Sequence, residues 1–125
     1  APLRLGQIQR YINTAEQLGV LPIIYTGLSS GLRQCELITL SWADFHVRYR
    51  YILKGQRLLI LNDKTALLLE QIPETASSYV FLNPKTEAPY KLHEFYYLHK
   101  KILKQARLPW VAFRDLQRQC MEVGI

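Results

Sequence analysis

The chain has 125 residues, of which 49% are hydrophobic, and this suits one compact domain with a core of ordinary size. Its 16 Lys and Arg against 10 Asp and Glu give a net charge of +6, which favours a polyanionic partner, nucleic acid first. The two cysteines are far apart and the three histidines are scattered, which argues against a disulfide framework and a metal site. The sequence shows no apolar run long enough to span a bilayer. With no secretory leader in sight, a reducing, cytoplasmic setting is expected.

Helical periodicity dominates the first forty residues. Apolar residues recur at three- and four-residue steps before Gly19, which predicts an amphipathic helix over residues 6–18. Residues 21–25 are nearly all apolar and predict a second helical segment that is buried on every side. The polar, glycine-containing residues 26–31 interrupt the apolar pattern, which resumes over residues 32–42.

From Phe45 the apolar period shortens to two, which predicts a strand over residues 45–53. Residues 54–56 supply a turn, and residues 57–61 predict a second strand. A further turn at Asn62-Asp63 separates this strand from a third, predicted over residues 66–72. The middle of the chain is therefore expected to form a small three-stranded antiparallel sheet.

The last third of the chain returns to helical spacing. Loops are expected over residues 73–78 and 83–89, with a short extended piece between them. An amphipathic helix is predicted over residues 92–106, and a last helix over residues 113–123. The order of helices, small sheet and helices predicts an α+β, mostly helical domain.

Positive charge is concentrated in two later blocks of the sequence. The first block consists of Arg48, Arg50, Lys54, Arg57 and Lys64, and the second of Lys100, Lys101, Lys104, Arg107, Arg114 and Arg118. A solvated basic face is the ordinary outcome of such patterning, and DNA contact is the functional one. The residues expected to contact the DNA backbone are Arg48, Arg50, Lys100, Lys101 and Lys104.

Residues 33–44 read Arg-Gln-Cys-Glu-Leu-Ile-Thr-Leu-Ser-Trp-Ala-Asp and follow Tyr-Thr-Gly-Leu at residues 25–28. This segment resembles the first arginine box of the tyrosine recombinases, or phage integrases. That box reads Thr-Gly, an apolar residue and the catalytic arginine, then a glutamate three residues on, Leu or Ile, a second Leu, Trp and Asp. The resemblance implies that Arg33 is the catalytic arginine and that Glu36 supports it. A planar guanidinium suits the role because it matches two oxygens of the scissile phosphate.

The register of this box has two interpretations. Residues 29–32 lie between the Thr-Gly-Leu triplet and Arg33, whereas the family's arginine follows its triplet directly. Either four residues are inserted, or Ser29 holds the place of the arginine. Without the family pattern, an arginine that caps the helix or pairs with Glu36 on its surface is the simplest structural explanation of the two residues.

Lys64 follows the two predicted strands and is expected in a tight turn after Asn62-Asp63. It resembles the lysine in the family's β-hairpin, which protonates the departing 5′-oxygen, and a mobile cationic tip suits a general acid. Ile72-Pro73 stands where the family often has Val-Pro. The resemblance therefore implies a catalytic role for Lys64.

Residues 113–118 resemble the family's second arginine box, His-x-x-Arg, and the helix over residues 92–106 resembles the family segment that precedes it. Arg114 stands in place of the histidine and Gln117 in place of the arginine, while Asp115-Leu116 match. Arg118 is one residue beyond the expected arginine. The candidate catalytic set is therefore Arg33, Lys64, Arg114 and Arg118.

The resemblance covers residues 1–125 as a single tyrosine-recombinase catalytic-domain-like unit without the family's N-terminal core-binding domain. None of the eight tyrosines follows Arg118, so the family's nucleophile is absent from this sequence. The implied activity is site-specific DNA cleavage and rejoining by the parent protein through a phosphotyrosyl intermediate, with no cofactor or metal. The implied partner is double-stranded DNA, on which several copies assemble.

Two other functions fit the sequence. One is a noncatalytic, integrase-like DNA-binding remnant of a mobile element. The other is a helical adaptor whose basic face serves an acidic protein. Salt separates these classes, because phosphate contacts weaken steeply with salt on any duplex and an adaptor ignores DNA.

Overall fold

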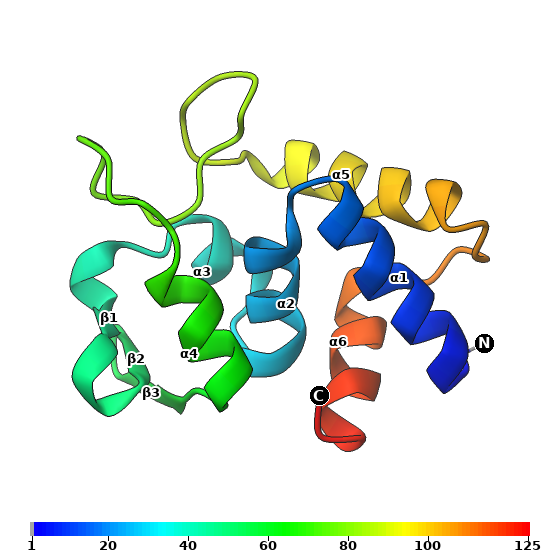
Figure 1. Cartoon of the computed structure of the whole chain (residues 1–125), viewed down its shortest axis with the longest axis horizontal. Helices are drawn as coiled ribbons and strands as arrows, with labels where there is room; N and C mark the ends of the chain where they lie inside the picture. Colours follow the sequence, from blue (N-terminus) through cyan, green and yellow to red (C-terminus); the bar gives the residue numbers. More distant parts are fainter. Residues whose placement is uncertain (1) are drawn as a thin grey trace.

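Helices surround one central helix in this fold (Figure 1). The structure is a computed structural model and describes residues 2–125. The helices are α1 (Leu5–Gln17), α2 (Leu21–Ser30), α3 (Gln34–Ile38), α4 (Asp63–Glu70), α5 (Leu92–Gln105) and α6 (Phe113–Glu122). The strands are β1 (Phe45–His46), β2 (Tyr51–Lys54) and β3 (Arg57–Ile60), and 3-10 turns cover Trp42–Asp44 and Val47–Tyr49.

Helix α2 is the core of the molecule. Residues 23–28 are all buried, so the predicted burial of residues 21–25 is confirmed except at half-buried Pro22. The interruption predicted over residues 26–31 is wrong as far as Ser30, because the helix continues to that residue. Helix α2 packs against α1, α3, α4 and α6. Gly31 ends α2 with a left-handed backbone (φ 80°), which glycine adopts without steric cost. Gly27 lets α6 approach closely, because a Cβ there would lie 2.8 Å from Leu37 Cδ2 and 2.9 Å from Phe113 Cζ. Glycine at this position therefore serves helix packing.

The sheet has three antiparallel strands in the order β1-β2-β3, which confirms the predicted size and type of the sheet. Its composition differs from the prediction. The strand expected over residues 45–53 is split into β1 and β2 by a 3-10 turn that ends at Arg50 with φ 54°. The buried face carries Ile52, which pairs with Phe45 and Leu59 on the neighbouring strands.

The third strand predicted over residues 66–72 is wrong, because this segment belongs to helix α4. Asn62 caps the helix, accepting a hydrogen bond from the Thr65 backbone N–H at 2.8 Å. Thr65, Ala66 and Leu69 are buried, and the helix packs against α2. A short apolar run after Asn-Asp fits a strand after a turn and a capped helix equally well, and tertiary packing selects the helix.

Helices α5 and α6 form where the periodicity predicts them, and a buried histidine joins them to α1. Each nitrogen of the His99 ring has one hydrogen-bond partner. Tyr11 Oη lies 2.7 Å from Nδ1, and the Val111 carbonyl oxygen lies 2.7 Å from Nε2. A carbonyl only accepts, so Nε2 carries the proton and Nδ1 accepts from the tyrosine hydroxyl. The ring is neutral in this arrangement.

Acid is expected to destabilise the fold through His99. Burial lowers the pKa of His99 below its ordinary 6.5, although the hydrogen bond to Val111 opposes this shift. Below about pH 6.5 the unfolded chain therefore binds a proton that the folded protein refuses, so stability falls until pH reaches the lower folded pKa. Urea unfolding midpoints at pH 7.5 and 5.5 measure this loss. His99→Gln should reduce it, and an unchanged loss in that variant would contradict the assignment.

Candidate nucleic-acid interface

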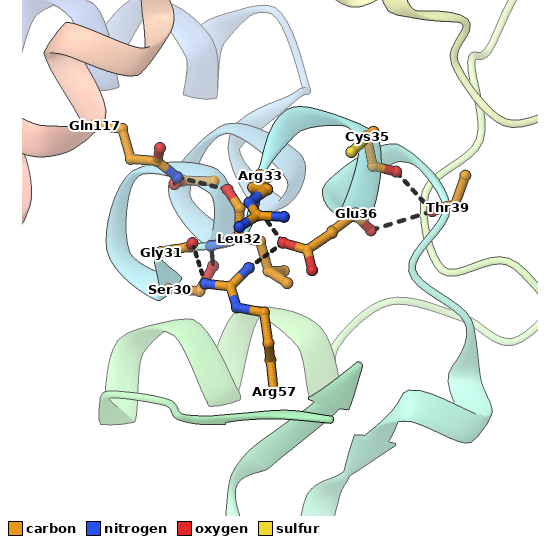
Figure 2. Close-up of polar contacts among 10 residues, drawn as sticks. Ser30, Gly31, Leu32, Arg33, Cys35, Glu36, Thr39, Arg57 and Gln117 are labelled. Atoms are coloured by element: carbon orange, nitrogen blue, oxygen red, sulfur yellow. Dashed lines mark hydrogen bonds and ion pairs between the residues drawn. The ribbon is translucent and has the colours of Figure 1, made fainter. Parts of the chain in front are cut away.

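Arg33 lies at the junction of α2 and α3, where the chain turns after the left-handed Gly31 and the buried Leu32 (Figure 2). The Arg33 backbone N–H donates to Oε1 of Glu36 at 2.8 Å and so starts helix α3. The Arg33 guanidinium is exposed, and within residues 2–125 it takes part in no hydrogen bond or ion pair. This cation is available to a ligand.

Glu36 does not pair with the Arg33 guanidinium. Its carboxylate binds the Arg57 guanidinium, which also donates to the Gly31 carbonyl at 3.0 Å (Figure 2). The Glu36 side chain is only 15% exposed, so this charge pair is shielded more than a surface pair. Of the two structural explanations, capping is therefore confirmed, since Arg33 is the N-cap of α3, and a surface ion pair between the Arg33 and Glu36 side chains is wrong.

Ser29 and Arg33, the two candidates for the first arginine position, lie in different surroundings. Thr26, Gly27 and Leu28 lie buried within α2 and belong to no loop. The Ser29 hydroxyl lies 2.6 Å from Thr65 Oγ1 and so joins α2 to α4. The residues directly before Arg33 are Ser30-Gly31-Leu32, which repeat the order hydroxyl, glycine and apolar residue without any insertion.

Gln117 holds the same turn from the side of α6. Its amide Nε2 donates to the Gly27 carbonyl at 2.6 Å and to the Leu32 carbonyl at 2.7 Å (Figure 2). Both N–H groups of the amide are therefore used in fixing the backbone next to Arg33. An amide at this position contributes no charge, so Gln117 positions the turn and does not replace an arginine electrostatically.

A basic hollow opens between the end of α2, strand β3 and α6. Arg114 and Arg118, four residues apart on α6, both reach it. The hollow is lined by Ser30, Gly31, Arg57, Leu59, Arg114, Gln117, Arg118, Met121 and Glu122. The predicted residues Arg114 and Arg118 are thus brought together beside the Gly31–Arg33 turn, although Arg33 itself does not line the hollow. Because Arg57 is already paired with Glu36, the excess positive charge of the hollow comes from Arg114 and Arg118 against the one Glu122 carboxylate, which suits a phosphate or another anion.

Lys64 is not in a turn, and that prediction is wrong. It lies in the first turn of α4, where its Nζ is 4.7 Å from the centre of the Tyr25 ring, and it does not line the basic hollow. The lysine of the β2–β3 hairpin is Lys54, next to Gly55. The Lys-Gly turn signal at residues 54–55 was sufficient to find it.

Lys54 ties its hairpin to the body of the fold. Its Nζ donates to the Thr39 carbonyl at 2.8 Å and to Asp44 Oδ2 at 3.2 Å. Burial alone would raise the pKa of Asp44, but hydrogen bonds from the Ser41 backbone and from Lys54 outweigh it and hold this pKa below its ordinary value. Asp44 is therefore charged at neutral pH and keeps Lys54 in place.

The residues predicted to bind the DNA backbone lie in separate places. Arg48 and Arg50 line a different hollow, beside Trp42 and α4, and Arg50 forms an exposed ion pair with Asp63 at 2.6 Å. The remaining ones, Lys100, Lys101 and Lys104, are exposed on α5. The fold does not gather these five side chains into the basic hollow.

Membrane-spanning helices and metal-binding groups are both absent from the described chain, residues 2–125. No helix there is long and apolar enough to cross a membrane. No three His, Cys, Asp or Glu side chains there are grouped so as to hold a metal ion.

Comparisons with known proteins identify the fold. No protein-family model and no curated protein sequence matches the chain. The structure is similar to the crystal structure of XerA recombinase, with a TM-score of 0.82 and 17% sequence identity over 96% of this chain. The match spans 47% of the XerA recombinase chain, so this chain corresponds to about half of that protein. The predicted tyrosine-recombinase catalytic-domain-like fold is confirmed.

Proposed function

We propose that this chain, which has the fold of a recombinase, is a DNA-binding domain in which the Arg33 guanidinium contacts a backbone phosphate of double-stranded DNA. The uncommitted Arg33 guanidinium is the observation that carries this proposal. Glu36 and Gln117 both bind the peptide unit between Leu32 and Arg33, through its N–H and its carbonyl oxygen, so the guanidinium is presented from a rigid turn. A planar guanidinium with no internal partner is suited to two oxygens of one phosphate.

Arg114 and Arg118 extend the same surface. Both are exposed on α6 and line the hollow next to the Arg33 turn. We place further phosphates of the same duplex at these two side chains, with Arg118 supplying the charge that Gln117 lacks. Lys64 remains the predicted lysine that protonates a departing oxygen, and Lys54 becomes a second candidate because it lies in the hairpin.

Strand cleavage is proposed only for a parent protein that supplies a nucleophile. The recombinase reaction needs a tyrosine that attacks the phosphate, and no tyrosine follows Arg118 in residues 1–125. The noncatalytic alternative is a DNA-binding remnant. It is supported by Arg114 and Gln117 at the two diagnostic positions of the second box, because a hydrogen-bonded neutral amide cannot neutralise a transition state.

Duplex binding that weakens steeply with salt is the expected result. Fluorescence anisotropy of a labelled duplex, measured across a salt series, should give a slope of log K against log salt of about −0.9 for each phosphate contacted. Arg114→Gln combined with Arg118→Gln should make this slope shallower by about two contacts. Lys85→Gln is the single-charge control, since Lys85 does not line the basic hollow. A chain that binds no duplex at low salt contradicts both DNA functions.

A further inference from the structure

Three large aromatic side chains are exposed side by side on α5 and the loop that follows it. Tyr96, Tyr97 and Trp110 are 46%, 60% and 52% exposed. The centres of the Tyr96 and Tyr97 rings are 5.4 Å apart, and those of Tyr96 and Trp110 are 5.5 Å apart. Single exposed apolar residues are normal, but a contiguous group of aromatic rings in water marks an interaction site.

This aromatic group is held in place by the buried core. The Trp110 ring lies 5.5 Å, centre to centre, from the His99 ring. His99 is itself fixed by hydrogen bonds to Tyr11 and Val111. The rings therefore need little further ordering to bind a flat partner, which lowers the entropic cost of binding.

The two tyrosine rings have lysines beside them, whereas the hollow next to Trp110 is lined by Asp115, Arg118 and Glu122. Lys100 follows Tyr96 by four residues and Lys101 follows Tyr97 by four, so each lysine lies one helical turn from a ring. In the described chain these lysines form no ion pair, and the one acidic residue of α5, Glu94, accepts from the Lys91 backbone N–H at 2.7 Å. The complementary partner combines flat apolar groups with negative charge.

We propose that Tyr96, Tyr97 and Trp110 form a stacking platform for unpaired nucleotides, with Lys100 and Lys101 contacting the phosphates. Unpaired DNA offers free base faces and a charged backbone, whereas the bases of an intact duplex are stacked on one another. An acidic protein offers the charge without a repeating series of rings. This platform does not use the Arg33 turn or the basic hollow, so it goes beyond the proposed function.

The test uses a single-tryptophan form of the chain. The chain has two tryptophans, and Trp42→Phe removes an indole N–H that has no hydrogen-bond partner, which leaves Trp110 as the reporter. A thymidine oligonucleotide should quench and shift the emission of Trp110, whereas a blunt duplex of equal length, which is expected at the Arg33 surface, should leave that emission unchanged. Tyr96→Ala and Tyr96→Leu should each weaken oligonucleotide binding at least about fivefold, because stacking on one ring is lost.

Two controls sharpen this test. Tyr79→Ala, which removes a 37% exposed tyrosine outside the platform, should bind the oligonucleotide like the single-tryptophan form. Arg33→Ala should lose duplex affinity and keep the quenching, so that failure of the platform and failure of the duplex site are distinguishable. Oligonucleotide binding without a change in Trp110 emission, equal quenching by the duplex, or equal quenching by polyglutamate would each overturn the platform.

Discussion

Phe113→Ala is expected to lower the free energy of unfolding by about 3–5 kcal/mol, the largest stability effect of any substitution considered for this chain. Phe113 is 4% exposed and packs edge-on against Phe95, with ring centres 5.0 Å apart at 83°. It also fills the space over Gly27 and lies 5.3 Å from the His99 ring, centre to centre. Truncation leaves a cavity where α6 docks on α2 and α5.

Urea unfolding followed by circular dichroism measures this effect. Phe113→Leu, which keeps much of the buried volume, should cost clearly less and gives a folded variant for comparison. Tyr79→Ala, on the surface, should change the free energy of unfolding by no more than about 0.5 kcal/mol. A loss below about 1 kcal/mol in Phe113→Ala would mean that α6 does not dock on α2 in solution.

Arg33→Ala is expected to have the largest functional effect. In the parent protein with its nucleophile, it should reduce covalent adduct formation on a nicked suicide substrate by about 100-fold or more, the range for losing one transition-state-stabilising donor. Arg33→Lys should not restore the adduct, because an ammonium group lacks the planar fork of the guanidinium. The Arg33 side chain is exposed, so both variants should unfold at the same urea concentration as the unsubstituted protein.

The adduct is measured on a denaturing gel as protein that migrates with labelled DNA. Lys85→Gln is the matched control, because it also removes one exposed positive charge, and it should form the adduct at the same rate as the unsubstituted protein. Undiminished adduct formation by Arg33→Ala would remove Arg33 from the active site. A folded parent protein that binds duplex DNA and forms no adduct would favour the noncatalytic alternative.

Helices α1, α5 and α6 were predictable because each carries its own local pattern. Apolar residues at three- and four-residue steps define α1 and α5. Gly31 ends α2 because its left-handed backbone is one that glycine adopts readily. The segment at 62–72 was not predictable in this way. Its Asn-Asp start and short apolar run are compatible with both a turn before a strand and a capped helix, and contacts with α2 decide between them.

In the candidate site, too, some features follow from the sequence alone and others only from the tertiary structure. The sequence by itself determined that Arg33 and Glu36 belong to one motif, since they are neighbours one helical turn apart. Only the tertiary structure decided that Glu36 binds Arg57, 21 residues away, and that Gln117 holds Leu32 from 85 residues away. It also decided that Lys64 lies in helix α4 and not in a turn, whereas the hairpin turn beside Lys54 was already indicated by Lys54-Gly55. Side-chain chemistry and periodicity are local properties of a sequence, whereas the partner of each charge depends on which distant helices and strands pack together.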